Sequence, residues 1–269
     1  MTYKMLVVDI DDTLLNSNHE ISALTYQRLQ DLQAAGVYLV LASGRPTESM
    51  VETARHLRLD LYQSYIISYN GAVVTRMSDQ KELFSQRLEI EDQKALIQAI
   101  QSRHLCLTTY VDGKILLDYP NQYSDVEAEL TGLEANYSPQ TIAELDKPCL
   151  KFMAVGDPSQ VAEWNQELQG HFGKKVYATT SKPFFLEFMH QDVSKGEAIS
   201  KLCHYLNMNL DAVIACGDGN NDASMIQVAG LGVAMANASD YLKSISDYIT
   251  LSNDQDGLIK VIDEFILKD

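Results

Sequence analysis

A nearly unbroken apolar run near the start of the chain ends in three carboxylates. The run is MLVVDIDDTLL, residues 5–15, with acids at Asp9, Asp11 and Asp12. Its apolar part has no polar face, which is typical of a strand buried in a parallel sheet. Clustered carboxylates repel one another and are costly to bury without a partner. The sequence therefore predicts a buried strand whose end presents acids to something positively charged.

Short apolar runs alternate with helical patterns at both ends of the chain. Residues 21–37 have helical spacing, with Ser22 as the predicted N-cap and Gly36 as the predicted stop, and the apolar run YLVLASG follows. From Lys195 onward, a second helical pattern precedes the run DAVIACGD. This alternation predicts an α/β fold with a doubly wound, Rossmann-like parallel sheet.

The alternation of apolar runs with helical patterns stops after about residue 82. One segment predicts a hairpin that turns at Asp112 and Gly113, and three further strand-like runs follow, CLKFMAVG, KVYATTS and FFLEFMH. We therefore expect a core domain made from residues 1–82 and 190–269, interrupted by an inserted α+β domain over residues 83–189.

The charge, the cysteines and the apolar runs of the chain indicate which partners and which cellular compartment to expect. The chain has 21 basic and 37 acidic residues and a net charge of -16, which disfavours nucleic acid and anionic membrane surfaces as partners. Its four cysteines lie far apart without CxxC pairs, so neither a zinc site nor a disulfide framework is predicted. No apolar run approaches the ~20 residues of a membrane span, and the first run is too short for a signal peptide. We expect a cytoplasmic protein that is a monomer or a small homo-oligomer.

Three predicted core strands end in polar residues, and such strand ends are where parallel sheets bind ligands. The residues are Asp9 and Asp11 after the first strand, Ser43, Gly44 and Arg45 after the second, and Asp218, Asn221 and Asp222 after the third. Lys195 begins a helix, so its ammonium and the free N–H groups of that helix can face the same pocket. Carboxylates suit Mg²⁺, whereas the lysine and the hydroxyl and glycine N–H donors suit a phosphate.

The motifs DIDDT, SGR, SKG and GDGNND, in this order and at strand or helix ends, resemble those of the haloacid dehalogenase superfamily. The chain is similar to the Cof-type phosphatases, whose large C2-type cap is inserted between the second and third motifs. The resemblance covers essentially the whole chain, including the closing SNDQDGL. It implies a Mg²⁺-dependent phosphatase for a small phosphorylated metabolite, such as a sugar phosphate, FMN or PLP, with the inserted domain as its specificity cap.

The resemblance also implies roles for the motif residues. Asp9 would be the nucleophile that forms an aspartyl-phosphate, and Asp11 would be the general acid and base. Asp9, the main-chain carbonyl of Asp11, and Asp218 would hold the metal, with Asp222 orienting its water. The phosphate would be bound by Ser43, Gly44, Lys195, Asn221 and the main chain at Ile10.

Other residues near the motifs have less defined expectations. Arg45 is predicted either to touch the phosphate or leaving group or to form a surface ion pair. His190 and Glu187, close to the predicted domain boundary, are candidates for substrate contact. Asp12 occupies a position where many relatives have glycine, and it has no predicted chemical role.

Three alternatives compete with a phosphatase. A calcium-binding EF-hand is disfavoured, because Leu14 and Ala223 stand where the two candidate loops need glycine. A phospho-receiver signalling domain also uses an aspartate and a lysine on a doubly wound sheet, but an inserted domain has no purpose there. A phosphosugar mutase uses the same aspartyl-phosphate, and analysis of its products would separate it from a phosphatase.

Overall fold

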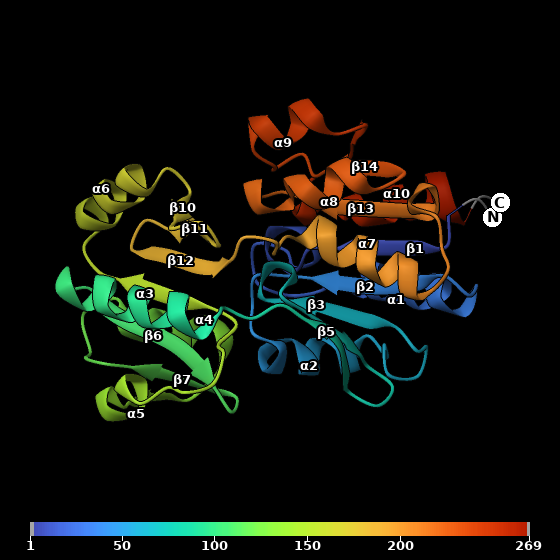
Figure 1. Cartoon of the computed structure of the whole chain (residues 1–269). Helices are drawn as coiled ribbons and strands as arrows, with labels where there is room; N and C mark the ends of the chain where they lie inside the picture. Colours follow the sequence, from blue (N-terminus) through green and yellow to red (C-terminus); the bar gives the residue numbers. More distant parts are fainter. Residues whose placement is uncertain (1–2, 268–269) are drawn as a thin grey trace. The chain divides into compact units, whose positions relative to one another are not determined.

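The chain forms two compact units in a computed structural model that describes residues 3–267. The first unit contains the described residues up to Phe84 and those from Ser194 onward, and the second is Ser85–Val193 (Figure 1). The second boundary lies after residue 193 rather than after the predicted 189. The reason is that His190 still pairs with Val176 inside the sheet of the second unit, so it does not belong to the core domain.

The first unit is built on an eight-stranded sheet with the order β15-β14-β13-β1-β2-β3-β4-β5. Its strands are β1 (Met5–Val8), β2 (Tyr38–Ala42), β3 (Tyr65–Ser68), β4 (Val73–Arg76), β5 (Lys81–Ser85), β13 (Val213–Gly217), β14 (Leu231–Ala234) and β15 (Tyr248–Ile249). The strands from β15 to β3 pair in parallel, and β4 turns back antiparallel on β3. In Figure 1, blue β1 lies beside orange β13, so both ends of the chain build the centre of this sheet.

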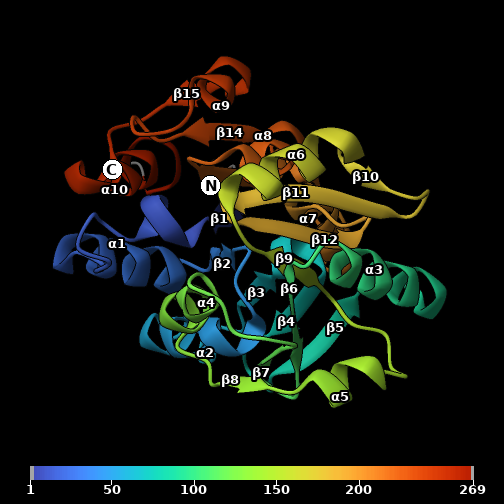
Figure 2. The same cartoon turned by 90° about the vertical axis from the view of Figure 1, so that its left-hand side faces the viewer.

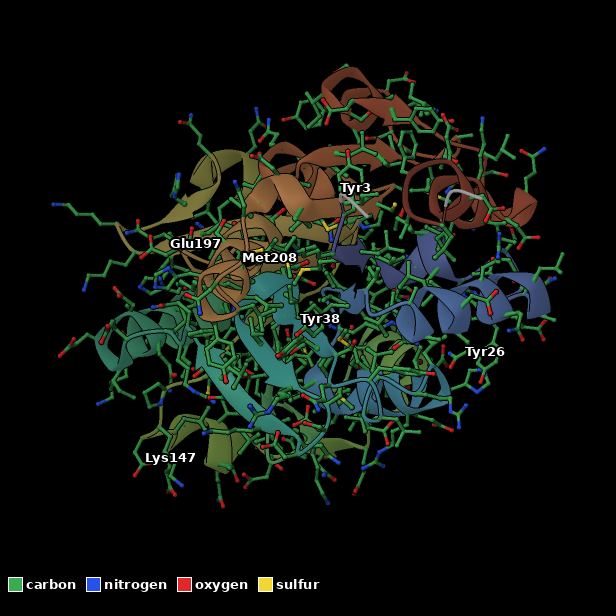
Figure 3. All side chains as sticks on the ribbon, turned by 90° about the vertical axis from the view of Figure 1, so that its right-hand side faces the viewer. Tyr3, Tyr26, Tyr38, Lys147, Glu197 and Met208 are labelled. Atoms are coloured by element: carbon green, nitrogen blue, oxygen red, sulfur yellow. The ribbon has the colours of Figure 1, made fainter. Side chains whose placement is uncertain are left out.

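Helices cover both faces of this sheet, as the predicted doubly wound α/β fold requires. They are α1 (Ala23–Ala34), α2 (Thr47–His56), α7 (Lys195–Tyr205), α8 (Ala223–Val228), α9 (Asp240–Ile245) and α10 (Gly257–Val261). Leu6 and Val8 of β1 pack with α1, α2 and α10, whereas the alternating Met5 and Val7 pack with α7, α8 and α9. Figure 3 shows the two layers, with Tyr26 on the α1 side and Met208 on the α7 side.

Local sequence signals place several of these elements. Ser22 Oγ accepts a hydrogen bond from the Thr25 N–H at 3.0 Å and caps α1, and Gly36 takes the left-handed φ of +83° just after the helix ends. Both predictions for this helix are confirmed. Short 3-10 and π turns complete the connections: η1 (Ile10–Leu14), η2 (Tyr69–Gly71), η3 (Leu210–Ala212), η4 (Asn220–Asp222), η5 (Asn253–Gln255) and η6 (Ile262–Ile266).

The second unit is a seven-stranded, mostly antiparallel sheet with four helices (Figure 2). Its strands follow the order β10-β11-β12-β9-β6-β7-β8. They are β6 (Cys106–Val111), β7 (Lys114–Leu117), β8 (Ala135–Tyr137), β9 (Phe152–Val155), β10 (His171–Phe172), β11 (Val176–Lys182) and β12 (Phe185–His190). The helices are α3 (Ile90–Ser102), α4 (Ser124–Thr131), α5 (Pro139–Ala143) and α6 (Pro158–Leu168). The predicted hairpin turn at Asp112 and Gly113 is confirmed, since both residues have positive φ between the antiparallel β6 and β7.

The apolar core of the second unit lies on one face of its sheet. Leu107, Phe152 and Phe188 point to this face and pack with α3, α5 and α6. Alternate residues of the same strands point to the opposite face, which carries the buried charges of Lys151 and Glu187. The second unit therefore has one ordinary hydrophobic face and one face with buried polar groups.

The four cysteines are buried free thiols. Burial raises the pKa of Cys216 far above its ordinary range. Among the helices of residues 3–267, none has the length and apolar character needed to cross a bilayer.

Gly71 should be far more sensitive to substitution than Gly36. A Cβ on Gly71 (φ +107°) would lie 2.2 Å from the carbonyl oxygen of Ser194, just before α7, whereas one on Gly36 would meet nothing within 4 Å. We expect Gly71→Ala to lower the free energy of unfolding by about 3 kcal/mol or more and Gly36→Ala by about 1 kcal/mol. Urea denaturation measures both losses, and equal values would contradict the close approach of this turn to α7.

Candidate active site

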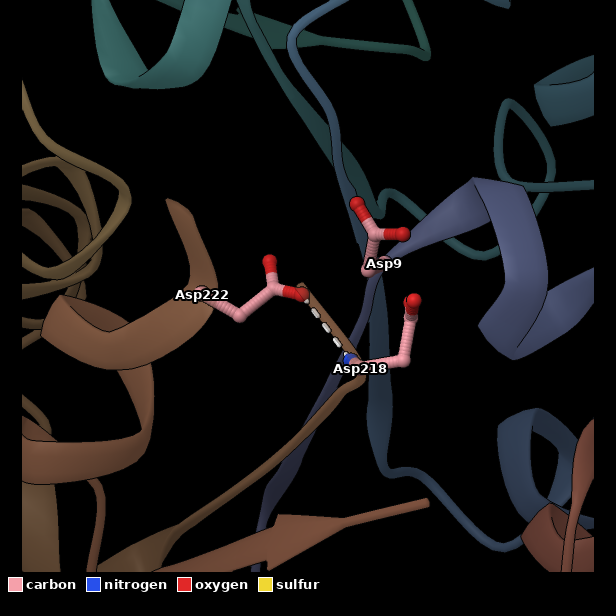
Figure 4. A group of neighbouring side chains, drawn as sticks. All are labelled: Asp9, Asp218 and Asp222. Atoms are coloured by element: carbon pink, nitrogen blue, oxygen red, sulfur yellow. Dashed lines mark hydrogen bonds between the residues drawn. The ribbon is translucent and has the colours of Figure 1, made fainter. Parts of the chain in front are cut away.

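Three carboxylates converge where β1 and β13 end. Asp9 directly follows β1, Asp218 directly follows β13, and Asp222 ends the short turn η4. Because Val8 and Cys216 are register partners in neighbouring parallel strands, both strands deliver their next residues to the same edge of the sheet. One oxygen from each carboxylate lies within 4.8 Å of the others (Figure 4). The expected meeting of the first and last acidic motifs is therefore present.

Lys195 bridges two of these acids. Its Nζ lies 2.5 Å from Asp9 Oδ1 and 2.6 Å from Asp222 Oδ1. The lysine is the first residue of α7, whose N-cap Ser194 accepts a hydrogen bond from the Glu197 N–H. Burial opposes the charge of Lys195, but the Asp222 and Asp9 carboxylates outweigh it and raise the pKa of the lysine. The ammonium therefore stays charged as the fixed cation of the site.

One ammonium does not balance three carboxylates. Burial raises the pKa of Asp9 well above its ordinary range, and the charges of Asp222 and Asp218 add to this effect against the opposing Lys195. Burial, with the charges of Asp222 and Asp12, likewise raises the pKa of Asp218 to about 6. The cluster therefore has an excess of negative charge and offers only oxygen donors, a combination that fits a hard divalent cation.

Asp222 also shapes the loop that carries Asp218. Its Oδ2 accepts hydrogen bonds from the backbone N–H groups of Asp218 at 3.0 Å and of Gly219 at 2.9 Å. Its other oxygen contacts Lys195. Because both oxygens are engaged, Asp222 ties the loop after β13 to the helix that presents the lysine.

Thr13 is a site residue that sequence reasoning missed. Its Oγ1 donates a hydrogen bond of 2.8 Å to Asp218 Oδ1, joining the turn after β1 to the loop after β13. The threonine stands in the DIDDT motif, which is the signal that could have identified it. This contact fixes one oxygen of Asp218 and opposes the rise of its pKa.

The second motif lies at the end of β2, next to β1. Ser43 is buried, and its Oγ accepts a hydrogen bond from the Arg45 N–H at 3.2 Å. Asn70 links this region to the fourth motif, because its N–H donates to the Ser43 carbonyl and its Oδ1 accepts from Asn221 Nδ2 at 3.1 Å. A Cβ on Gly44 would lie 3.0 Å from this same Oδ1. Sequence reasoning missed this link.

Asp11 does not belong to the group of three clustered carboxylates and forms an ion pair with Arg45. Arg45 donates to its two oxygens, through Nε at 2.9 Å and Nη2 at 2.6 Å. The side chains are 45% exposed for Asp11 and 22% for Arg45, so this pair is far more open than the cluster. Of the two expectations for Arg45, the ion pair is present.

Ile10 and His190, the two remaining candidate site residues, each have a backbone hydrogen bond in the structure. Ile10 is buried in the core at the start of η1, and its carbonyl accepts a hydrogen bond from the Leu15 N–H. His190 lies in the second unit, where its Nδ1 accepts from the Asp192 N–H at 3.2 Å. That hydrogen bond accounts for the buried ring, and substrate contact by His190 stays a prediction.

Comparison with known proteins agrees with these motifs. A family model of haloacid dehalogenase-like hydrolases matches residues 6–262. Two relatives in Bacillus subtilis are named 5-amino-6-(5-phospho-D-ribitylamino)uracil phosphatases. YcsE is 29% identical, with 98% of this chain and 96% of its own length covered, and YwtE is 28% identical, with 98% of each covered.

Solved structures share the whole fold. The crystal structure of a haloacid dehalogenase-like hydrolase from Bacteroides thetaiotaomicron matches with a TM-score of 0.91 and 35% identity, covering 98% of this chain and 100% of the other. TM0651 from Thermotoga maritima matches with a TM-score of 0.87 and 28% identity, covering 99% and 98%. With a family match over nearly its full length, this chain belongs to the haloacid dehalogenase-like hydrolases and is a phosphatase of that superfamily.

Proposed function

We propose that this protein is a Mg²⁺-dependent phosphomonoesterase that hydrolyses a small phosphorylated metabolite through an aspartyl-phosphate on Asp9. The observation that carries the proposal is the buried Asp9 carboxylate, held by the Lys195 ammonium at 2.5 Å within a cluster of acids. Phosphoryl transfer asks a protein chiefly for positioning and charge neutralisation, and this cluster has the groups for both.

The proposed metal site lies where the clustered carboxylates carry an excess of negative charge. Asp9 and Asp218 would hold Mg²⁺ together with the main-chain carbonyl of Asp11, and Asp222 would stay outside the ligands, where it holds Lys195 and the loop of Asp218. When bound, the ion would neutralise charge on the phosphoryl group. Phosphate contacts are proposed for Ser43, Gly44, Asn221, Lys195 and the Ile10 main chain.

The proposed reaction has two displacements at phosphorus. In the first, an oxygen of Asp9 forms a bond to phosphorus, the bond to the leaving alcohol breaks, and Asp11 gives that alcohol a proton. In the second, Asp11 takes a proton from water as the water oxygen attacks phosphorus. The bond between phosphorus and Asp9 then breaks, which releases phosphate and restores the carboxylate.

The second unit is proposed to select the leaving group. Its polar sheet face holds a buried ion pair, with Lys151 Nζ 3.2 Å from Glu187 Oε1, and Ser181 Oγ donates to the same oxygen at 2.7 Å. The lysine also lies 5.3 Å from the ring centre of Tyr110, whose hydroxyl donates to Glu127. Carboxylates, an ammonium and hydroxyls suit a polyhydroxylated group.

The names of the two relatives support a substrate of this class, because both are named for a phosphorylated ribityl compound. We therefore favour a sugar or polyol phosphate over the other predicted substrates, FMN and PLP. The four buried free thiols suit a reducing compartment, and we propose a cytoplasmic protein, either a monomer or a small homo-oligomer.

Replacing the nucleophile should abolish turnover. Asp9→Asn keeps the shape of the side chain but replaces the nucleophilic carboxylate with a neutral amide, so phosphate release from ribitol 5-phosphate and p-nitrophenyl phosphate should fall by about three orders of magnitude or more. A malachite-green assay with Mg²⁺ measures this. The matched control is Asp211→Asn, an exposed acid at the other end of β13, which should retain activity. Near-normal turnover by Asp9→Asn would refute the nucleophile assignment.

Metal binding should tighten as the pH rises. With the pKa of Asp218 at about 6 and that of Asp9 also raised, the metal-free cluster holds protons at pH 5 that a cation must displace. As Asp218 loses its proton, we expect the affinity for Mg²⁺ to rise at least about fivefold between pH 5 and 6, and we expect the contribution of Asp218 to level off above about pH 7. Isothermal titration calorimetry of the metal-stripped protein gives the affinities. A pH-independent affinity, or unchanged binding by Asp218→Asn, would contradict the site.

The buried ion pair of Lys151 and Glu187 in the second unit allows an effect on substrate specificity to be separated from an effect on folding. Removing one partner, as in Lys151→Met, should lower the free energy of unfolding by about 3 kcal/mol, whereas Lys151→Met/Glu187→Leu should restore most of it. If this face selects the leaving group, the stable double variant should lose its preference for ribitol 5-phosphate over p-nitrophenyl phosphate. Ratios of kcat/KM measure that preference, and an unchanged ratio would exclude the pair from substrate selection.

A further inference from the structure

The turn that carries Asp11 contains a residue with an unfavourable backbone conformation. Asp12 has a φ of +58° and a ψ of 9°, in the left-handed region that residues with a side chain adopt at a cost. The turn is closed by two backbone hydrogen bonds, from the Leu14 N–H to the Asp9 carbonyl and from the Leu15 N–H to the Ile10 carbonyl. Contacts from outside the turn can offset part of this cost.

Two asparagines from the far end of the chain bind the same turn. Asn237 Nδ2 donates a hydrogen bond of 2.7 Å to the carbonyl of Asp12, and Asn253 Nδ2 donates one of 3.0 Å to the carbonyl of Leu15. Asn237 Oδ1 in turn accepts from the Asn253 N–H at 3.1 Å. Since the acceptor end of the Asn237 amide is occupied by this N–H, its donor end is fixed toward Asp12.

We propose that Asn237 is a positioning residue that holds the left-handed backbone of Asp12 and so directs the residues on either side of it. Asp11 points to Arg45, whereas Thr13 points to Asp218, and the backbone between them passes through Asp12. A turn that relaxed at Asp12 would move both side chains. The effect on catalysis rests on the proposed phosphatase reaction, but the effect on the turn does not.

Hydrogen exchange tests the turn without any assay of activity. Asn237→Ala should speed amide exchange at Leu14 and Leu15 by about tenfold, because the bonds that protect these N–H groups open more often. The matched control is Asn209→Ala, which removes a local side-chain hydrogen bond to the Asp211 N–H at the opposite end of β13. This control should leave exchange in the turn unchanged.

Kinetics then separate positioning from general destabilisation. We expect kcat of Asn237→Ala to fall about tenfold, because Asp11 is misplaced, while KM stays within about twofold and the thermal midpoint stays near that of Asn209→Ala. Glycine adopts positive φ without strain, so Asn237→Ala/Asp12→Gly should recover most of the lost kcat and of the lost protection. The control Asn237→Ala/Asp12→Asn also removes the negative charge of Asp12 but keeps a side chain at that position. It should therefore recover less of the lost kcat and protection than the glycine double variant.

The outcomes distinguish this inference from the proposed function. If the unmodified protein releases no phosphate but the exchange rates change as described, the phosphatase proposal fails and the role of Asn237 in the turn stands. If the unmodified protein turns over and Asn237→Ala matches it in kcat and exchange, the inference is overturned. A glycine double variant no better than Asn237→Ala would also overturn it, because the bond would then have another purpose than holding Asp12.

Discussion

The contact of the Lys195 ammonium with Asp9 and Asp222 is the interaction on which the site depends. Two unit charges about 4 Å apart interact by roughly 4 kcal/mol at an effective dielectric constant of 20, so buried acids this close would separate or take up protons without a cation. The lysine offsets part of that repulsion, and the backbone N–H groups that bind Asp222 offset a further part. The remaining, uncompensated negative charge is what would attract a divalent cation.

The position of this cluster follows from the order of the strands. Asp9 and Asp218 come from opposite ends of the chain, and they meet only because β1 and β13 are parallel neighbours at the centre of the sheet. Both faces of β1 are apolar, with one set of side chains packed against α1 and the other against α7, and the pairing of Val8 with Cys216 brings the ends of the two strands level. The apolar core and the charged site are thus products of the same strand pairing.

Much of this arrangement could be predicted from the sequence, because it depends on local patterns. Apolar runs, the Ser22 cap and the turn at Gly113 are encoded over a few residues, and strand ends in a parallel sheet must share an edge. The contacts of Thr13 and Asn70 were missed, because they join residues that are far apart in the sequence through irregular turns with left-handed backbone at Asp12 and Asn70. Hydrophobic periodicity carries no information about such turns. The end of β12 is likewise not marked by a change of residue type, and for this reason the predicted boundary assigned His190 to the core domain rather than to the second unit.

The turn after β1 separates two acids that are only two residues apart. Asp9 stays in line with the strand and enters a buried cluster beside a fixed ammonium, whereas Asp11 leaves the strand and faces Arg45 with nearly half of its side chain exposed. Two carboxyl groups in such different surroundings can do different chemistry, one as a nucleophile shielded from water and the other as a group that exchanges protons with it. A regular strand would place both side chains on the same face with similar neighbours. The irregular turn, with its left-handed residue, therefore gives two like acids the different surroundings that the proposed reaction requires.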